Sequence, residues 1–257
     1  MKFRPCIDLH NGKVKQIVGS TLSDDRPENL TTNFVAEQPS AYYAAKYKQD
    51  GLTGGHIIML GPGNEQAALE ALQAFPGGLQ IGGGIVPANG RTWLDRGAAA
   101  VIVTSFVFQG GKVHEEKLAE MAVAVGPRNL VLDLSCRKRG DDYFVVTDRW
   151  QKFTDVKISR ESLAYFAQYC AEFLIHAADV EGKCSGIAVD LVKNLGNWVA
   201  IPATYAGGVR SLTDMELVRE LGDGRLDVTV GSSLDIFGGS GITYEEAVAF
   251  HNSCQPD

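Results

Sequence analysis

Two aspartates give the first indication of chemistry in this sequence. Asp8 ends an apolar run that begins at Arg4, and Asp133 ends a second apolar run that begins at Leu130. If buried strands bring both carboxyl groups to one site, their surroundings can leave one ionised as a base and the other protonated as an acid. An aspartate at a strand end is also a common turn residue, so each alone says little. The pair predicts a site for proton transfer.

Paired glycines repeat at nearly the same interval as the aspartates. Gly83-Gly84-Ile85 recurs as Gly207-Gly208-Val209, 124 residues later, and Asp133 follows Asp8 by 125 residues. Two independent features that share one offset indicate an internal duplication. We therefore expect two similar halves, about 1–125 and 126–257, each with one acid and one glycine turn.

Glycine turns after strands also suggest what the site binds. Their backbone N–H groups can hold a phosphate without cationic side chains, although the simpler interpretation is a tight turn between a strand and a helix. Turns at duplicated positions favour a ligand with phosphate at each end. The predicted contacts are Gly83, Gly84, Thr104 and Ser105 on one side, and Gly207, Gly208, Gly231 and Ser232 on the other.

The elements that must position these residues are eight apolar strands alternating with helices. This alternation is typical of a closed (β/α)₈ TIM barrel, although a doubly wound sheet would give a similar pattern. The duplication favours the barrel, and 257 residues with 45% hydrophobic content fit one such domain over residues 1–257. The expected strands are Arg4–Leu9, His56–Leu60, Leu79–Ile81, Ala100–Val103, Leu130–Leu134, Phe173–Ala177, Ala203–Ala206 and Asp227–Val230.

Two further segments are expected to cover the barrel mouth. His10-Asn11-Gly12-Lys13 has Asn-Gly at its centre and is followed by an alternating run to Val18, which is typical of a hairpin. Residues 20–38 are polar and irregular, so we expect a mobile active-site loop there. After Asp133, the basic turn 135–140 and the apolar run 143–147 predict a second hairpin.

Composition narrows the class of protein. A net charge of −7 argues against nucleic-acid binding, which usually needs a basic face. The five cysteines are scattered and lack a CxxC pair, so neither a disulfide framework nor a zinc site is indicated. The first strand starts within a few residues of Met1, and no apolar run approaches the ~18 residues of a membrane span. We expect a cytoplasmic protein that binds no metal, nucleic acid or membrane.

Six motifs, spread over essentially the whole chain, resemble those of a known family. They are Cys6–Val14, Ile81–Ile85, Val131–Lys138, Thr147–Phe153, Tyr205–Val209 and Val230–Ser232. The family that they resemble is the phosphoribosylformimino-aminoimidazole-carboxamide ribotide isomerase of histidine biosynthesis, in particular its eukaryotic branch. The resemblance implies a duplicated (β/α)₈ barrel, an Amadori rearrangement of an aminoaldose to an aminoketose, no cofactor, and a small bisphosphorylated ribotide as substrate. We also expect a monomer.

The resemblance also implies roles for single residues. Asp8 is expected to be the general base and Asp133 the general acid, while Trp150 matches a loop tryptophan that stacks on the substrate. His176 stands where bacterial members usually have threonine, and it is a polar partner for Asp8, an auxiliary acid or a structural histidine. Arg137 is expected to contact substrate phosphate.

The chain also departs from bacterial members at two arginine positions. These members usually have arginines at the positions of Gln16 and Val86. The contacts of those arginines are unassigned in this chain, and Arg137 or Lys138 are the candidates to replace them.

Two other functions remain open on the sequence alone. The sister cyclase of the same pathway is also a duplicated barrel with two aspartates, but it is expected to have a lysine in the first hairpin, where this chain has Gln16. A non-catalytic phosphosugar-binding barrel would keep the glycine turns and could lose either aspartate. Both Asp8 and Asp133 are present, which favours the isomerase.

Overall fold

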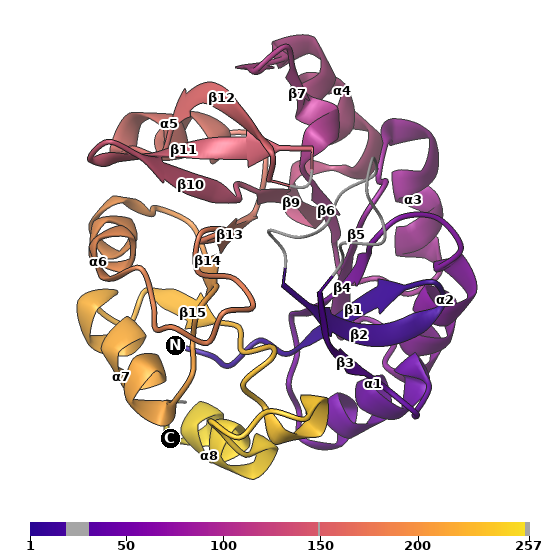
Figure 1. Ribbon diagram of the computed structural model, residues 1–257. Helices are drawn as coiled ribbons and strands as arrows, with labels where there is room; N and C mark the ends of the chain where they lie inside the picture. Colours follow the sequence, from indigo (N-terminus) through magenta and orange to yellow (C-terminus); the bar gives the residue numbers. More distant parts are fainter. Residues whose placement is uncertain (19–30, 149, 255–257) are drawn as a thin grey trace.

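The parallel strands of the chain form a closed ring surrounded by helices (Figure 1). The computed structural model describes residues 1–18, 31–148 and 150–254. The strand order closes on itself because Phe3 bridges Val228, with hydrogen bonds from Arg4 N–H and from Val228 N–H across the seam. The ring strands are β1 (Cys6–His10), β4 (Gly55–Met59), β5 (Leu79–Gly82), β6 (Val101–Val103), β9 (Leu130–Asp133), β13 (Glu172–His176), β14 (Ala203–Ala206) and β15 (Leu226–Val228). This is the (β/α)₈ barrel that the sequence predicts.

Helices cover the outside of the ring in Figure 1 and pack their apolar faces on it. In α6, for example, Leu191, Val192 and Leu195 are fully buried at helical spacing. Among the described residues, none of the helices is both long and apolar enough to cross a membrane. The helices are α1 (Ser40–Gln49), α2 (Glu65–Ala74), α3 (Pro87–Asp95), α4 (Glu115–Val125), α5 (Arg160–Phe166), α6 (Val189–Trp198), α7 (Leu212–Leu221) and α8 (Tyr244–Ser253).

The strands are apolar on both faces because each face packs in a separate hydrophobic cluster. Successive side chains of a strand point to opposite sides. Val101 and Val103 therefore join the large cluster between ring and helices, while Ile102 joins a small separate cluster inside the ring with Val131 and Leu174. The division into two half-barrels remains a prediction.

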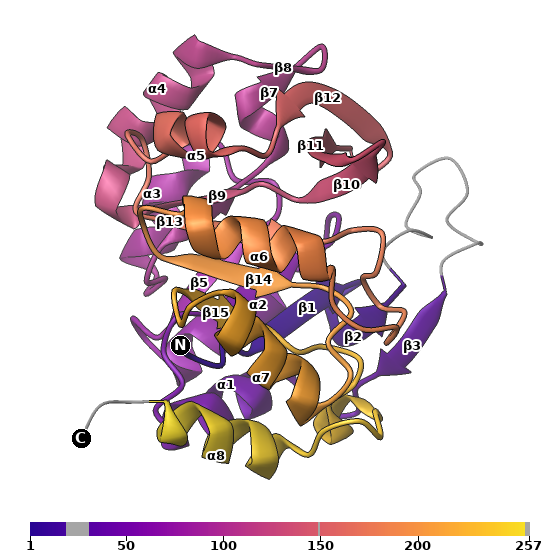
Figure 2. The same ribbon diagram turned by 90° about the vertical axis from the view of Figure 1, so that its left-hand side faces the viewer.

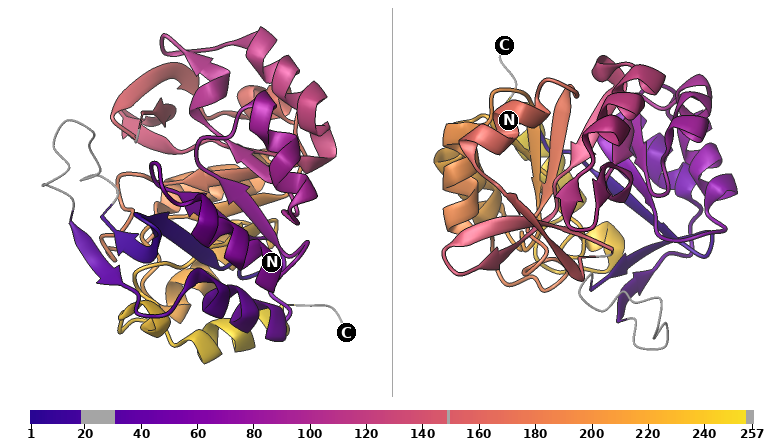
Figure 3. Two further views of the ribbon diagram at one scale, coloured as in Figure 1. Left: turned by 90° about the vertical axis from the view of Figure 1, so that its right-hand side faces the viewer. Right: turned by 90° about the horizontal axis from the view of Figure 1, so that it is seen from above.

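Two antiparallel additions extend from one end of the ring, the end at which the strands finish (Figures 2 and 3). β2 (Lys13–Ile17) pairs with β1 and with β3 (Thr32–Val35). The second addition is a three-stranded sheet of β10 (Cys136–Arg139), β11 (Asp142–Thr147) and β12 (Lys152–Lys157), rather than a simple hairpin. Short strands β7 (Phe108–Gln109) and β8 (Lys112–Val113) form a further hairpin that the sequence analysis did not predict.

The prediction of an irregular loop over residues 20–38 is wrong for its last part. Thr32–Val35 form β3, because backbone groups of the edge strand β2 are available to pair with this segment. The predicted mobile loop otherwise falls mainly on residues 19–30, which lie outside the described residues.

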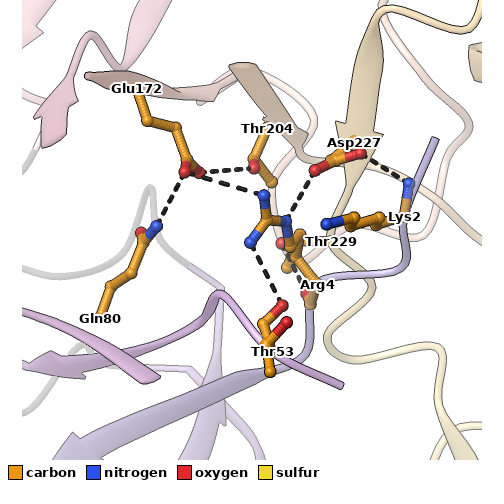
Figure 4. Close-up of polar contacts among 8 residues, drawn as sticks. All are labelled: Lys2, Arg4, Thr53, Gln80, Glu172, Thr204, Asp227 and Thr229. Carbon is orange, nitrogen blue, oxygen red and sulfur yellow. Dashed lines mark hydrogen bonds and ion pairs between the residues drawn. The ribbon is translucent and has the colours of Figure 1, made fainter. Parts of the chain in front are cut away.

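The opposite end of the barrel is filled by a buried network around Arg4 (Figure 4). Its Nε donates to Oδ2 of Asp227 at 2.7 Å, and its Nη2 lies 3.8 Å from Oε2 of Glu172. Glu172 also accepts hydrogen bonds from Gln80 at 3.0 Å and Thr204 at 3.2 Å. One cation therefore compensates two largely buried carboxylates, one from the start of β13 and one from the start of β15.

Removing Arg4 should destabilise the fold strongly. Arg4→Ala leaves Asp227 and Glu172 buried without their cation, so the free energy of unfolding should fall by about 3–5 kcal/mol in urea denaturation followed by circular dichroism. Arg91→Ala is the control, because the Arg91–Asp95 pair is 69% and 62% exposed and should contribute no more than about 0.5 kcal/mol. Equal losses in the two variants would contradict this interpretation of the network.

Candidate active site

Two neighbouring cavities open at the end of the ring where the strands finish. The larger has a volume of about 610 Å³ and lies against β5, β6 and β9, and the smaller lies against the turns after β14 and β15. Asp8, His176 and Glu181 line both cavities. Of the other predicted site residues, Gly83, Gly84, Thr104, Ser105, Asp133 and Trp150 line the larger cavity, and Gly207, Gly208, Gly231 and Ser232 line the smaller one.

Asp8 lies in β1 at the boundary between the two cavities. Nε2 of the buried Gln16, from β2, donates a hydrogen bond to Oδ2 of Asp8 at 3.2 Å. Burial and the neighbouring Glu181 raise the pKa of Asp8 to about 7, although His176 and Gln16 oppose this shift. A carboxylate with this pKa can gain and lose a proton near neutral pH, which is what a general base requires.

Asp133 occupies a different environment at the end of β9. The backbone N–H and Oγ of Ser135 both donate to Oδ1 of Asp133, at 2.8 and 2.6 Å, and Oγ1 of Thr104 donates to Oδ2 at 3.2 Å. Burial opposes ionisation, but His176 and the Ser135 donors outweigh it and lower the pKa of Asp133. Asp133 is therefore ionised at neutral pH, and Thr104 uses its hydroxyl to hold this carboxylate.

His176 ends β13 between the acidic groups. Its Nδ1 lies 3.7 Å from Oδ1 of Asp133, which is an ion-pair distance rather than a hydrogen bond. Burial alone would lower its pKa, but Asp133, Glu181 and Asp8 together raise the pKa of His176 to about 9. The ring is thus a cation at neutral pH, whereas burial and His176 lower the pKa of the adjacent His56 to about 3 and keep it neutral.

Glu181 is the residue that the sequence analysis missed. It follows β13 in the run Asp179-Val180-Glu181-Gly182 and lies beside Asp8 and His176. Burial raises the pKa of Glu181, while the charge of His176 opposes the shift. One feature of the sequence could have indicated Glu181. It is an acidic residue followed by glycine, and it comes shortly after the strand that ends at the predicted site residue His176.

The positions in the glycine turns favour glycine for two different physical reasons. A Cβ on Gly83 would lie 2.1 Å from the Met59 carbonyl oxygen, and a Cβ on Gly208 would lie 2.1 Å from the Gly186 carbonyl oxygen. Close backbone packing therefore excludes side chains at both positions. Gly84 has a φ of +69° with no atom within 4 Å of its Cβ position, so the space beside it is available to a ligand.

These geometric features agree with comparisons to known proteins. A sequence profile described as histidine biosynthesis protein matches residues 2–238. The chain belongs to this histidine biosynthesis family. A Neurospora crassa relative is 53% identical over 253 residues, covering 97% of this chain and 98% of that protein. It is named 1-(5-phosphoribosyl)-5-((5-phosphoribosylamino)methylideneamino) imidazole-4-carboxamide isomerase.

Two further relatives of this family carry the same isomerase name. The Medicago truncatula relative, which is also named chloroplastic, is 52% identical over 257 residues, covering 98% of this chain and 82% of that protein. The Saccharomyces cerevisiae relative is 46% identical over 251 residues, covering 95% of this chain and 96% of that protein.

Within this histidine biosynthesis protein, two expectations about side chains need correction. The pKa of Asp133 is lowered, which is opposite to the raised pKa that a neutral general acid needs, because Ser135 and His176 stabilise its charge. Arg137 lines neither cavity: its Nε donates to Oδ1 of Asp179 at 2.8 Å. Lys138, the other candidate for phosphate, pairs with Asp190.

Trp150 and Val86 both line the larger cavity. The Trp150 ring centroid lies 5.6 Å from that of His176, with the ring planes tilted by 40°. An aromatic face beside the cation gives a flat ligand a surface on which to stack. Val86, at the position of a bacterial arginine, brings no charge to this cavity.

Gly84→Ala should weaken binding of a phosphate in the larger cavity. The new methyl group would occupy the open space, so KM should rise about tenfold, the equivalent of about 1.4 kcal/mol, with little change in kcat. Gly77→Ala is a matched control, since Gly77 has the same φ of +69°, equally open surroundings and a position before β5 at the other end of the barrel. A KM change of the same size in both variants would argue against a phosphate site at Gly84.

Proposed function

We propose that this chain isomerises the substrate named in its relatives, converting an aminoaldose to an aminoketose by an Amadori rearrangement. The observation that carries the proposal is the arrangement of two glycine-lined cavities on either side of one cluster of ionisable groups. The name of the relatives' substrate contains two phosphoribosyl groups, so it has a phosphate at each end. One phosphate would bind at each set of glycine turns, which places a ribose beside Asp8 and His176.

The proposed phosphate contacts are mainly backbone groups. Gly83, Gly84 and Ser105 serve one end of the substrate, and Gly208, Gly231 and Ser232 serve the other. Binding by backbone N–H groups suits a chain with a net charge of −7, because it needs no cationic pocket. Trp150 would stack on the planar imidazole between the two phosphates.

The chemistry follows from the protonation states of the cluster. His176 donates a proton to the ring oxygen of the ribose as the bond from that oxygen to C1 breaks. The nitrogen attached to C1 then forms a double bond to C1. Asp8, ionised, removes the proton from C2, and the electron pair of that bond forms C1=C2 while the C=N electrons return to nitrogen. Transfer of the C2 hydroxyl proton and protonation at C1 then give the ketone. C2 is oxidised and C1 is reduced within the same molecule, so no external oxidant or reductant is consumed.

Asp133 acts in this scheme through His176. Its carboxylate raises the pKa of the imidazolium and is itself fixed by Ser135 and Thr104. We assign the proton donor to His176 instead of Asp133, because His176 carries a proton at neutral pH and Asp133 does not.

The proposal extends to the binding partner, the oligomeric state and the cellular compartment of the protein. The protein acts on a small bisphosphorylated ribotide and needs no second protein for the reaction. We propose a monomer in the cytoplasm. In the described part of the chain, the large exposed apolar side chains belong to four different elements, Val35 to β3, Tyr42 to α1, Val123 to α4 and Val189 to α6, and the five cysteines are unpaired.

A direct assay distinguishes this function from that of the sister cyclase. The purified protein should convert the ribotide in the absence of glutamine, glutaminase and ammonia, and a downstream cyclase added with its glutaminase and glutamine should then consume the product, as followed by absorbance. Turnover that requires an ammonia source in the first step would contradict the proposal.

Asp8→Asn should abolish most of the activity. The amide keeps the shape of the side chain but cannot accept the C2 proton, so kcat should fall by about 10² or more, the usual scale of general acid–base catalysis. Steady-state kinetics checks the loss, and product binding by calorimetry serves as the control that the site is intact. Near-normal turnover by this variant would rule out Asp8 as the base.

The pH dependence should identify the acid. Asp8 must be ionised, so kcat/KM should fall as pH drops below about 7, and His176 must be protonated, so it should fall again above about 9. His176→Gln should remove the alkaline limb. Asp133→Asn should move that limb to lower pH, because the main group that raises the pKa of His176 is lost. If His176→Gln keeps the alkaline limb and Glu181→Gln loses it, the donor is Glu181.

A further inference from the structure

The segment after β13 carries Glu181 into the site and is held at Asp179. Oδ1 of Asp179 accepts from Nε of Arg137 at 2.8 Å, and Oδ2 accepts from the backbone N–H of Lys138, also at 2.8 Å. Both donors belong to β10. The two carboxylate oxygens of one aspartate thus join the sheet that follows β9 to the segment that follows β13, two residues before Glu181.

The same segment is held from the other side at Gly182, one residue after Glu181. Its carbonyl oxygen accepts from Nδ2 of Asn33 in β3 at 3.2 Å. Gly182 has a φ of +71°, and a Cβ there would lie 2.6 Å from the Ile17 carbonyl oxygen of β2. Glu181 therefore lies between two attachment points, one to each of the antiparallel additions at the barrel mouth.

We propose that Asp179 is a positioning residue for the reaction: by binding Arg137 and the Lys138 backbone, it fixes Glu181 beside Asp8 and His176. The inference rests on the proposed function for the role of Asp8. It also gives Arg137 a role that differs from phosphate binding, since its guanidinium is occupied by Asp179 and lies over the ring of Phe153, 5.4 Å from the ring centroid.

The position of Glu181 matters because of the groups that face it. Asp8 and Cys6 face it from β1, His176 from β13 and Tyr205 from β14. Among these groups, Glu181 disfavours the charge of Asp8 and favours that of His176. Displacing Glu181 should therefore let the pKa of Asp8 fall, and the acid limb of the pH profile should move to lower pH.

This role differs from a contribution to stability. The Arg137 and Asp179 side chains are 40% and 38% exposed, and ion pairs at such exposure contribute little to folding. The rate of an enzyme, in contrast, is sensitive to displacements of about 1 Å in a group at the site. Loss of the Asp179 contacts should consequently affect kcat and the pH profile far more than the unfolding temperature.

The test combines Asp179→Asn with Glu181→Gln. Asp179→Asn should lower kcat about 10- to 100-fold and move the acid limb to lower pH, with an unchanged unfolding temperature. In the Glu181→Gln background, adding Asp179→Asn should change neither quantity further. Asp190→Asn is the matched control, because Asp190 ties Lys138 and Tyr143 of the same sheet to α6 without touching the segment of Glu181. This variant should keep the wild-type kcat and pH profile.

Two results would overturn the inference. One is an equal loss of kcat from Asp179→Asn in both backgrounds, which would show that it acts independently of Glu181. The other is a wild-type kcat and acid limb in Asp179→Asn. Carboxyl ¹³C NMR titration of Asp8 in the same variants gives a readout without turnover. A shift of the Asp8 pKa in Asp179→Asn alone, absent in the Glu181→Gln background, supports the inference even if the ribotide is not the substrate.

Discussion

The ion pair between His176 and Asp133 is the interaction on which the site depends. Burial alone would lower the pKa of His176, and the surrounding carboxylates raise it enough to keep the ring charged. Asp133 can serve as the permanent anion because Ser135 and Thr104 stabilise its charge. Among the described residues, Gln16 donates a hydrogen bond to Asp8, and burial and the neighbouring Glu181 raise the pKa of Asp8 instead. Two aspartates, one from β1 and one from β9, therefore have different protonation properties, as the proposed roles of a base and of the partner of an acid require.

The barrel places the buried network of Arg4 at one end and the cavities at the other. At the end where strands begin, Arg4 compensates Asp227 and Glu172 and helps to close the seam between the first and last ring strands. At the end where strands finish, side chains from several strands converge on the cavities, as in other barrels of this architecture. The antiparallel additions contact the segment after β13, through Arg137 at Asp179 and through Asn33 at Gly182.

The barrel fold and many of the residues that line the two cavities could be predicted from the sequence. Runs apolar on both faces, such as Val101–Val103, and the repeated glycine turns were sufficient for the ring and for the walls of both cavities. The protonation states could not be predicted, because they depend on distances between residues far apart in the chain, such as His176 and Asp133. Arg137 was misassigned for the same reason: a basic residue near a site favours phosphate until a nearer carboxylate, Asp179, is located. Glu181 was missed because its burial comes from neighbouring segments rather than from its own sequence pattern.

A ¹⁵N NMR titration of the His176 ring in the unliganded protein measures its protonation state directly. We expect His176 to stay protonated through neutral pH and to titrate near pH 9, because the surrounding carboxylates favour the charged ring. Titration at or below about 6.5, the ordinary value for a histidine, would contradict it, because the carboxylates would then not hold a proton on the ring.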